Sequence, residues 1–447
     1  MLRAGSILKN LAVFILAAFV MLGLLIIVAK IPKDKIRDNA LVSARYLSEG
    51  EQFGTVIENV EGSRIDRYAD SILLNIAYNL DSRDSLRSVM LSAYYFTPYH
   101  EENENFLEAV KEDREPNQQY LRYWHGSIAL VRPLLMFLSL KQIYILNAVI
   151  LVILNLAFLI MAYKLHLRAP AVGMILASIL TGCWFVPLSL EYTWVFLLLP
   201  VVSMIALRLA VKGRRDRYAV LFLLSGMVTN YLDFLTAETV TLLVPLLMVL
   251  WAEGHPVVNT QGTFLCIGKD EAKDKKRTGI SGDCVIRISI RSAVAWGFGY
   301  VGMWILKWVL TAAVFKENVM PYVAEHVGER IGGDLGINIF GYLTGAITRN
   351  IGCLFPLGYG LAGAFAGVGL VIFAAYLGFV YRGKDYNGIS LIAFAVIGLI
   401  PYVRFLILHN HAYLHCFFTY RAQYATVLAA VLTVAELTGW GAGNRSK

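Results

Sequence analysis

The apolar segments of this chain are distributed unevenly, with one alone near the start and the rest crowded together after a long polar stretch. Residues 10–30 form the first apolar run, and residues 31–141 are mostly polar. From Gln142 to Gly441 the chain is almost continuously apolar, with short polar breaks. A helix needs about 20 apolar residues to cross a hydrocarbon core about 30 Å thick. The pattern therefore predicts an anchor helix, one large loop on a single side of a membrane, and then a helical bundle.

The overall composition supports this interpretation. Of the 447 residues, 57% are hydrophobic and 16% are charged, and the mean hydropathy is +0.58. We expect an all-α, polytopic membrane protein with about ten transmembrane helices and a large, mostly helical first outer loop. The ten predicted spans are residues 10–30, 142–163, 170–189, 193–211, 217–232, 236–253, 292–314, 354–380, 388–408 and 420–438.

The chain divides into five predicted regions. They are an N-terminal anchor helix (1–30), an outer-face loop domain (31–141), a first membrane bundle (142–253), a cytoplasmic loop (254–291) and a second membrane bundle (292–447). The apolar stretch 127–140 is too short to span a membrane, so we expect a re-entrant or interfacial helix there. Within the loop domain, Ser63 is expected to cap a helix that runs through Asp70 to Asn79, and a second short helix is expected at residues 105–111.

Charged residues orient the predicted spans. Between Ile31 and His125 there are 17 acidic and 11 basic residues, a net charge of −6, so the rest of the chain carries +14 and the whole chain +8. With a cytoplasmic N-terminus, every short loop rich in lysine and arginine falls on the cytoplasmic side, as the positive-inside rule requires. Both termini are then cytoplasmic and the loop domain lies outside. The basic charge comes from these loops, and no nucleic-acid partner is indicated.

Polar residues that are unusual in a membrane bundle gather on the predicted outer side. They are Asp66, Asp70, Tyr123, His125, Arg132, Glu191, Asp233, Glu238, Lys307, Arg404, His411, His415 and Arg421. Charged groups at the mouth of a bundle are expensive and commonly mark a functional site. Carboxylates can act as a general base or hold a divalent cation, and Arg, Lys and His can neutralise a phosphate. This mixture fits an enzyme that takes a group from a lipid phosphate near the headgroup plane.

The acidic and aromatic residues also have structural explanations. Asp66 and Asp70 can be solvated helix-start acids that complement a helix dipole. Tyr123 and Trp124 can belong to an interfacial aromatic belt. The sequence leaves both alternatives open, because neither pattern is specific to a binding site.

The cations and histidines have structural alternatives too. Arg404 and Lys307 can pair with an acidic residue of another span and simply hold helices together. The candidate partners are Glu191, Asp233 and Glu238. His411 and His415 have the i, i+4 spacing of zinc ligands, but the sequence offers no convincing third ligand, so no metal site is assigned.

The layout of the chain resembles a known superfamily. The features concerned are the anchor helix, the acidic outer loop, the stretch Arg122–Gly126, the turn Tyr231–Phe234 and the segment His409–Arg421. In these features the chain resembles the C-type glycosyltransferases (the GT-C fold), and in particular uncharacterised bacterial members. Enzymes of that superfamily take sugars from polyprenyl-phosphate donors on the outer or lumenal face of a membrane.

The resemblance implies an inverting transfer of a sugar to the hydroxyl group of an extracytoplasmic glycan or lipid-linked acceptor. Asp70 is the first choice for the base that activates this hydroxyl, and Asp66 is the second. The candidates for substrate binding, including the cations that would stabilise the departing lipid phosphate, are Tyr123, His125, Arg132, Glu191, Asp233, Glu238, Lys307, Arg404, His411, His415 and Arg421. No cofactor is assigned, although the carboxylates leave Mg²⁺ or Mn²⁺ open. The lipid tail of the donor would lie between spans.

Two other functions remain compatible with the sequence. A lipid-linked glycan polymerase or ligase would share the outer cations but would need no carboxylate base so clearly placed. A lipid or solute transporter or flippase would place functional polar residues through the whole membrane depth, whereas the mid-span positions here are mostly apolar. We expect an integral protein of a bacterial plasma membrane with its active site outside.

Overall fold

Helices make up most of the protein. The structure, a computed structural model, describes residues 4–255, 280–331, 338–383 and 386–440. Within these ranges extended segments pair only at two isolated β-bridges, which join Thr55 to Arg64 and Tyr94 to Gln118. The expectation of an all-α fold is therefore confirmed for the described part of the chain. Most of the predicted cytoplasmic loop, residues 254–291, lies outside it.

Short connections join most of the helices. The first eleven are α1 (Ala4–Ala29), α2 (Arg37–Ser48), α3 (Arg67–Asn79), α4 (Ser85–Leu91), α5 (Glu102–Glu112), α6 (Ile128–Leu134), α7 (Leu140–Lys164), α8 (Arg168–Leu180), α9 (Leu190–Val211), α10 (Tyr218–Leu232) and α11 (Val240–Gly254). The later ones are α12 (Gly282–Phe315), α13 (Met320–Ile331), α14 (Ile339–Gly352), α15 (Gly360–Val380), α16 (Gly388–Ile407), α17 (His409–Leu414), α18 (Cys416–Thr419) and α19 (Tyr424–Thr438).

Six of the described helices are long and apolar enough to cross a membrane, as in a multi-pass membrane protein. They are α1, α7, α9, α12, α15 and α16. α8 and α11 are apolar but shorter, and α10 and α19 have 15 residues each. A helix of that length covers only about 22 Å at 1.5 Å per residue. Each of the ten predicted spans thus overlaps a helix, while the ten-span topology stays a prediction.

The predicted span at residues 170–189 is broken before its end. α8 stops at Leu180, and Gly182 then adopts a left-handed backbone with φ of +59°. The apolar run continues as the 3-10 turn Cys183–Leu188, which contains Pro187. Glycine permits positive φ and proline lacks an N–H group, so these two residues interrupt the α-helix. The turn leads the chain to Ser189, from which α9 begins.

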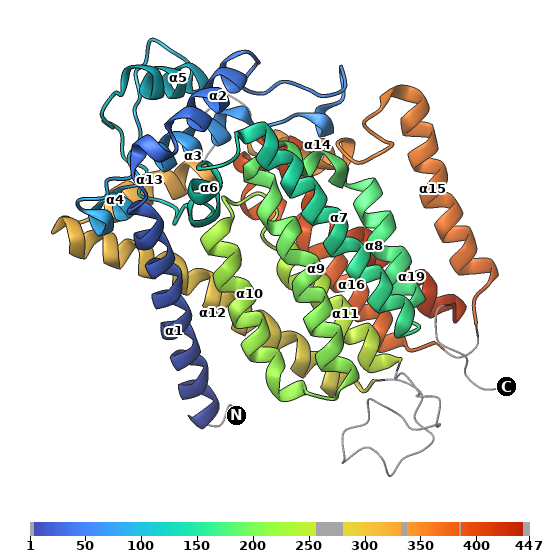
Figure 1. The fold of residues 1–447 in the computed structure, drawn as a ribbon. Helices are drawn as coiled ribbons and strands as arrows, with labels where there is room; N and C mark the ends of the chain where they lie inside the picture. Colours follow the sequence, from blue (N-terminus) through green and yellow to red (C-terminus); the bar gives the residue numbers. More distant parts are fainter. Residues whose placement is uncertain (1–3, 256–279, 332–337, 384–385, 441–447) are drawn as a thin grey trace.

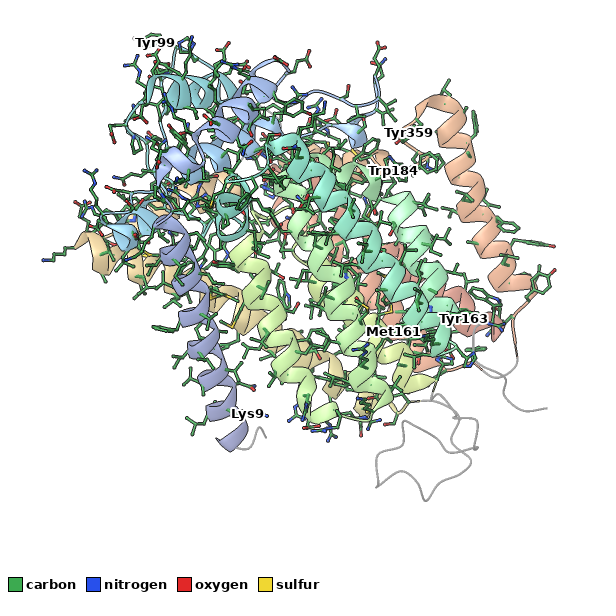
Figure 2. All side chains as sticks on the ribbon, viewed as in Figure 1. Lys9, Tyr99, Met161, Tyr163, Trp184 and Tyr359 are labelled. Atoms are coloured by element: carbon green, nitrogen blue, oxygen red, sulfur yellow. The ribbon has the colours of Figure 1, made fainter. Side chains whose placement is uncertain are left out.

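The helices form a bundle and a smaller layer at one end of it (Figure 1). α2, α3 and α5 lie together at one end, and the marks of the N- and C-termini lie toward the other. Lys9 and Tyr99 are labelled near these opposite ends in Figure 2. The chain between α1 and α7 therefore forms a layer of its own at one end of the bundle. The side of the membrane that this layer faces stays a prediction.

Large apolar side chains are exposed along the flanks of the bundle. Phe19 on α1, Ile153 on α7 and Phe379 on α15 are 75%, 58% and 83% exposed, respectively. Trp184 lies toward one end of the bundle and Tyr163 toward the other (Figure 2). Exposed aliphatic and aromatic side chains of this extent are typical of a surface covered by lipid, with aromatic residues near its two borders.

The helix predicted through residues 70–79 is present as α3, but Ser63 does not cap it. Asp66 does so, because its Oδ1 accepts a hydrogen bond of 2.7 Å from the Ala69 N–H. The Ser63 hydroxyl instead donates to the Val60 carbonyl at 2.8 Å within the 3-10 turn Glu61–Ser63. Asp and Ser are equally good N-cap residues, so the preceding turn decides between them. The second short helix predicted in this region is confirmed as α5.

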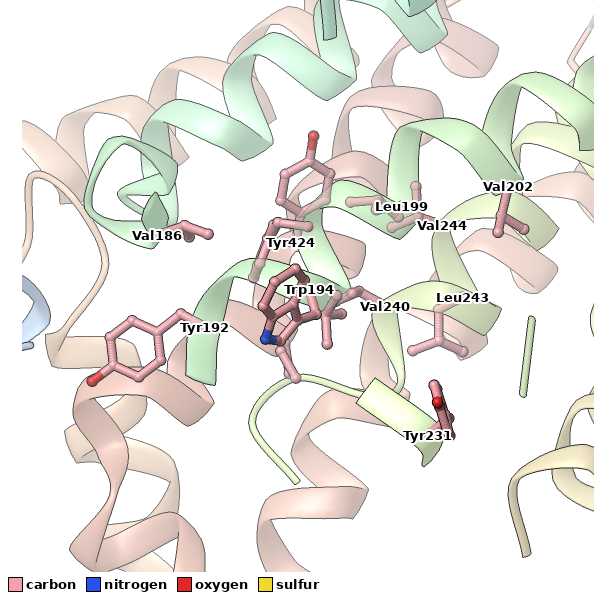
Figure 3. Close-up of a cluster of buried hydrophobic side chains, with 14 of the residues drawn as sticks. Val186, Tyr192, Trp194, Leu199, Val202, Tyr231, Val240, Leu243, Val244 and Tyr424 are labelled. Atoms are coloured by element: carbon pink, nitrogen blue, oxygen red, sulfur yellow. The ribbon is translucent and has the colours of Figure 1, made fainter. Parts of the chain in front are cut away.

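Apolar side chains of α9, α10, α11 and α19 meet in the core of the bundle (Figure 3). Trp194 of α9 lies beside Val240 of α11, with Leu243 on the next turn of α11. Tyr231 of α10 and Tyr424 of α19 belong to the same buried cluster. This packing surrounds the first turns of α9 and fixes the direction in which its N-terminus points.

α10 and α12 cross with their backbones in direct contact. A Cβ atom on Gly226 would lie 2.1 Å from the Trp296 carbonyl oxygen, and one on Gly299 would lie 2.3 Å from the Leu223 carbonyl oxygen. Real Cβ atoms do not approach other atoms so closely, so only glycine fits at either position. Membrane helices commonly use small residues to approach one another in this way.

The crossing predicts opposite effects for two substitutions on α12. Gly299→Ala should lower the thermal midpoint of the purified protein in detergent, because α10 and α12 must separate to admit the methyl group. Gly297→Ala is the matched control, because nothing lies within 4 Å of its Cβ position. Alanine favours a helix over glycine by about 1 kcal/mol, so Gly297→Ala should leave the midpoint unchanged or raise it. Equal midpoints for the two variants would contradict the crossing.

The predicted topology can be tested by labelling of introduced cysteines. Ser82 and Lys212 are both exposed. Ser82 lies between α3 and α4, in the layer formed by the chain between α1 and α7, and Lys212 lies at the end of α9. Ser82→Cys should react with an impermeant maleimide added to intact cells, and Lys212→Cys should react only after permeabilisation. The unsubstituted protein, whose described cysteines are buried or half-buried, gives the background. The reverse pattern would invert the topology.

Candidate functional site

A cavity of about 380 Å³ lies between the bundle and the layer formed by the chain between α1 and α7. Its walls come from α3, the segment before α6, the start of α9, the turn after α10, and α17 with α18. The lining side chains are Phe53, Asp66, Tyr68, Ala69, Ile72, Leu73, Tyr120, Arg122, Tyr123, His125, Glu191, Phe234, Asn410, His411, Leu414, His415 and Phe418. Two carboxyl groups, one guanidinium group and three imidazole rings thus share a wall made largely of aromatic side chains.

The structure divides the candidate residues into two groups. Asp66, Tyr123, His125, Glu191, His411 and His415 line the cavity. Asp70, Arg132, Asp233, Glu238, Lys307, Arg404 and Arg421 do not line it. Segments far apart in the sequence are therefore brought together, but only some of the expected polar residues face the same space.

Asp66 and Glu191 form a carboxyl pair in the cavity wall. Asp66 is the N-cap residue of α3, and Glu191 lies in the first turn of α9. Their side chains hydrogen-bond to each other, which requires that they share a proton. Burial raises the pKa of Asp66 to about 6, against the opposing effects of the Ala69 N–H and of Glu191. A carboxyl group with this pKa is mostly ionised at neutral pH and still basic enough to accept a proton.

Asp70 lies behind this pair, fully buried and surrounded by donors. Its carboxylate accepts hydrogen bonds from the backbone N–H groups of Leu190 at 2.9 Å and Glu191 at 3.2 Å. The hydroxyl groups of Ser189 and Tyr144 donate to it as well. Asp70 therefore satisfies the free N–H groups at the start of α9, where a negative charge is stabilised by the helix dipole.

Of the two carboxyl groups, only that of Asp66 faces the cavity. Helical spacing suggests that the two carboxylates share one face, but Asp66 is an N-cap with φ of −108° and ψ of 86°. Helical geometry begins only after it, so its side chain points into the cavity while Asp70 points toward α9. Burial raises the pKa of Asp70 to about 7, yet its oxygens are occupied by the chain itself.

The nitrogen-bearing side chains of the cavity come from two segments. Arg122 lies over the rings of Tyr120 and Tyr123, at 4.8 and 5.9 Å from their centroids. His411 of α17 and His415, which follows it by one turn, have ring centroids 5.0 Å apart. Stacking on these aromatic rings holds the Arg122 guanidinium group in the wall of the cavity.

Arg132 and Lys307 were expected to bind a phosphate, and both instead bind backbone carbonyl groups. Arg132 donates to Ala77 and Leu80 at the end of α3, and burial lowers its pKa to about 10. The Lys307 Nζ donates to Val89 and to its neighbour Met90, at the end of α4, at 3.0 Å each. Carbonyl groups at a helix C-terminus lack partners within the helix and attract cations. Arg132 therefore joins α6 to the end of α3, and Lys307 joins α12 to the end of α4.

The alternative in which Arg404 pairs with an acidic residue of another predicted span is confirmed, and the partner is Glu238. Its Nε lies 2.8 Å from Oε1 of Glu238, and its Nη2 lies 3.0 Å from Oε2. The same guanidinium donates to the Leu235 carbonyl at 2.6 Å. Asp233 accepts hydrogen bonds from the N–H and the hydroxyl of Thr236 and so closes the turn after α10. These groups join α16 to the chain between α10 and α11.

Arg421 is also held by its own surroundings. Its guanidinium lies between the rings of Tyr192 and Tyr420, at 4.7 and 4.8 Å from their centroids, and donates to the Phe417 carbonyl at 3.0 Å. In the described ranges no group of three or more His, Cys, Asp or Glu side chains is placed to hold a metal ion. The roles of Mg²⁺ and Mn²⁺ stay untested.

Several cavity residues were missed at the level of the sequence. They are Phe53, Tyr68, Tyr120, Arg122, Phe234, Asn410 and Phe418. Arg122, Phe234 and Asn410 lie inside the three segments that carry the resemblance, so proximity to those motifs could have indicated them. The remaining aromatic residues look the same in sequence as core residues, and only the fold places them at the cavity.

Comparison of the chain with protein-family models, with curated proteins and with solved structures finds no match. Its function is therefore inferred from its own geometry.

The ion pair of Arg404 predicts a defect of folding when it is broken. Arg404→Ala leaves the Glu238 carboxylate buried without its partner, which commonly costs about 3–5 kcal/mol. We expect a lower yield of monodisperse protein in detergent and a lower thermal midpoint. The double variant Arg404→Met with Glu238→Leu removes both charges and should recover part of the loss. If Arg404→Ala is stable and has lost only donor binding, a role of Arg404 in binding the phosphate would be the better explanation.

Proposed function

We propose that this protein is an inverting glycosyltransferase that moves a sugar from a polyprenyl-phosphate donor to an acceptor hydroxyl group. The observation that carries the proposal is the hydrogen-bonded pair of Asp66 and Glu191 inside a cavity that also holds Arg122, His411 and His415. Such a transfer needs a base for the acceptor and positive charge for the leaving phosphate. Both kinds of group face the same space here.

Asp66 is the base in this mechanism. Its carboxylate takes the proton of the acceptor hydroxyl as the oxygen attacks the anomeric carbon, and the bond from that carbon to the lipid phosphate breaks. Glu191 shares a proton with Asp66 and holds it in place. A base with a pKa of about 6 suits this role, because general catalysis is most effective when the pKa lies near the working pH.

The leaving phosphate is assigned to Arg122, His411 and His415. These groups line the cavity, whereas Arg132, Lys307, Arg404 and Arg421 do not. A guanidinium group can donate two N–H groups to a phosphate, and an imidazole ring can donate a further hydrogen bond. Positive groups that are already in position where charge develops lower the barrier most effectively.

The size and lining of the cavity also support a sugar substrate. Ligand cavities commonly have volumes of about 300–1,000 Å³, with aromatic walls and a few placed polar groups. At about 380 Å³ the cavity has room for a sugar ring with its phosphate, but a polyprenyl chain must lie outside it. We place that chain in the lipid beside the bundle, and we place the cavity on the outer side of a bacterial plasma membrane that the chain crosses ten times.

The buried charges bear on the alternative functions. A transporter that moves charge or solute through the bundle needs polar groups that can exchange partners along its depth. Lys307 and Arg404, the two cations buried within α12 and α16, each have local partners. A lipid-linked glycan polymerase or ligase would use the same cations but would need no carboxylate base so clearly placed as Asp66. We therefore favour transfer of a sugar and keep the polymerase or ligase as a second candidate.

Asp66→Asn should abolish the activity without damaging the fold. Purified protein is incubated with a panel of polyprenyl-phosphate sugars and acceptors, and release of the lipid phosphate is measured. Asn caps a helix as well as Asp but cannot accept the proton, so turnover should fall by about 10²-fold or more. Asp84→Asn is the matched control, because Asp84 is the N-cap of α4 and does not line the cavity. It should keep full turnover.

The stability of Asp66→Asn should rise while its activity falls. Asp66 has a pKa of about 6 in the folded protein and 3.8 as a free residue. Between about pH 4 and 6 the folded state holds a proton that the unfolded state has lost, so stability falls as the pH rises through this range, and the full cost of the buried charge is present above about pH 6. At pH 7.5 the thermal midpoint of Asp66→Asn should exceed that of the unsubstituted protein. The activity of the unsubstituted protein should rise with pH through about 6. Unchanged turnover in Asp66→Asn would reject the proposed base.

A further inference from the structure

His125 occupies an unusual position in the wall of the cavity. Its backbone is left-handed, with φ of +50°, a conformation that non-glycine residues rarely adopt and that is often found at functional sites. The next residue, Gly126, donates its N–H to the Tyr231 carbonyl at 2.9 Å, and a Cβ atom there would lie 2.4 Å from that carbonyl oxygen. This close contact with the end of α10 holds the turn that directs His125 into the cavity.

Aromatic rings surround the imidazole of His125. The ring centroids of Tyr120, Phe234 and Tyr123 lie 4.9, 5.4 and 6.2 Å from that of His125. The residue is only 2% exposed, and in the described part of the chain neither ring nitrogen has a side-chain hydrogen-bond partner; the backbone of Tyr123 is the one partner that His125 has there. Buried polar groups in proteins almost always have partners. The hydrogen-bonding capacity that the Tyr123 backbone does not use therefore calls for a group that comes from outside the chain.

The charge state of His125 limits what that group can be. Burial, and after it the positive charges of Lys307 and Arg122, hold the pKa of His125 well below its ordinary value. The ring is therefore neutral at physiological pH, with one N–H donor and one nitrogen acceptor. A hydroxyl group can donate and accept, so it matches both. A phosphate has only acceptor oxygens and a negative charge, which a neutral ring does not balance.

Glu191 lies in the wall of the same cavity and is 7% exposed. Its carboxyl group pairs with that of Asp66, and its Oε2 receives no hydrogen bond from an N–H or hydroxyl group of the described residues. Its backbone N–H is held by Asp70 and by the Ser189 hydroxyl, at 3.2 Å each, so the residue itself is fixed. A carboxyl oxygen held in this way is suited to accept a hydrogen bond from a hydroxyl group.

We propose that His125 and Glu191 form a subsite that binds hydroxyl groups of the sugar ring, separate from the cations that bind the phosphate. This inference rests on the proposed function, because it assigns the sugar of the donor to one part of the same cavity. The aromatic rings of Tyr120, Tyr123 and Phe234 form the wall against which the apolar face of the sugar packs. His125 thus selects for neutral, hydroxylated rings.

The test measures binding of sugar and of phosphate separately. A panel of methyl glycosides, and inorganic pyrophosphate as the anionic probe, are titrated into the full-length protein in detergent. His125→Phe keeps an aromatic ring but removes both nitrogens, so it should weaken binding of the preferred glycoside by about tenfold or more. Binding of pyrophosphate should not change. His125→Gln, which keeps a donor and an acceptor, should retain most of the glycoside affinity.

A second measurement needs no variant. In the unsubstituted protein with ¹⁵N-labelled histidine, the preferred glycoside should shift the ring nitrogen signals of His125, and pyrophosphate should shift those of His411 or His415. Failure of every glycoside to bind, equal glycoside affinity in His125→Phe, or a loss confined to pyrophosphate would each overturn the inference. Glycoside binding that depends on His125, without any sugar transfer from lipid donors, would uphold this subsite and reject the glycosyltransferase.

Discussion

The contact between Asp70 and the start of α9 supports the rest of the site. Asp70 belongs to the layer formed by the chain before α7, and α9 belongs to the bundle. A single buried carboxylate accepts the N–H groups of Leu190 and Glu191 together with the Ser189 hydroxyl. Since a helix N-terminus attracts negative charge and leaves its first N–H groups without partners, this contact joins the two layers and sets the position of Glu191.

The carboxyl pair depends on that contact. Asp66 ends the turn before α3, four residues ahead of Asp70, and Glu191 follows the capped N-terminus of α9. The same short stretch of α3 thus fixes both halves of the pair. Two buried carboxyl groups at hydrogen-bonding distance cannot both ionise readily, so one proton remains between them. This is an unfavourable arrangement for stability, and such arrangements commonly mark sites of function.

The cationic side chains discussed above occupy two kinds of environment. Arg132, Lys307 and Arg404 are buried against carbonyl groups or a carboxylate, and each joins elements that are distant in sequence. Arg122 instead stacks on aromatic rings at the cavity. A buried cation without a compensating partner is very costly, and Arg132, Lys307 and Arg404 find theirs in elements that are distant in sequence. Positive charge within a bundle is therefore weak evidence of a phosphate site until its partners are known.

The sequence alone determined the class of fold and the position of nearly every helix in the bundle, because the length and continuity of apolar runs limit what a segment can form. It also pointed to Asp66, His125, Glu191, His411 and His415, which do meet at one cavity. Only the tertiary structure decided that Asp70 caps α9 and that Arg404 pairs with Glu238. Hydrogen bonds and ion pairs join residues across large separations in the chain, and the direction of a side chain near a helix end depends on the local backbone. The spacing of residue types along the chain shows neither which distant residues pair nor which way a side chain at a helix end points.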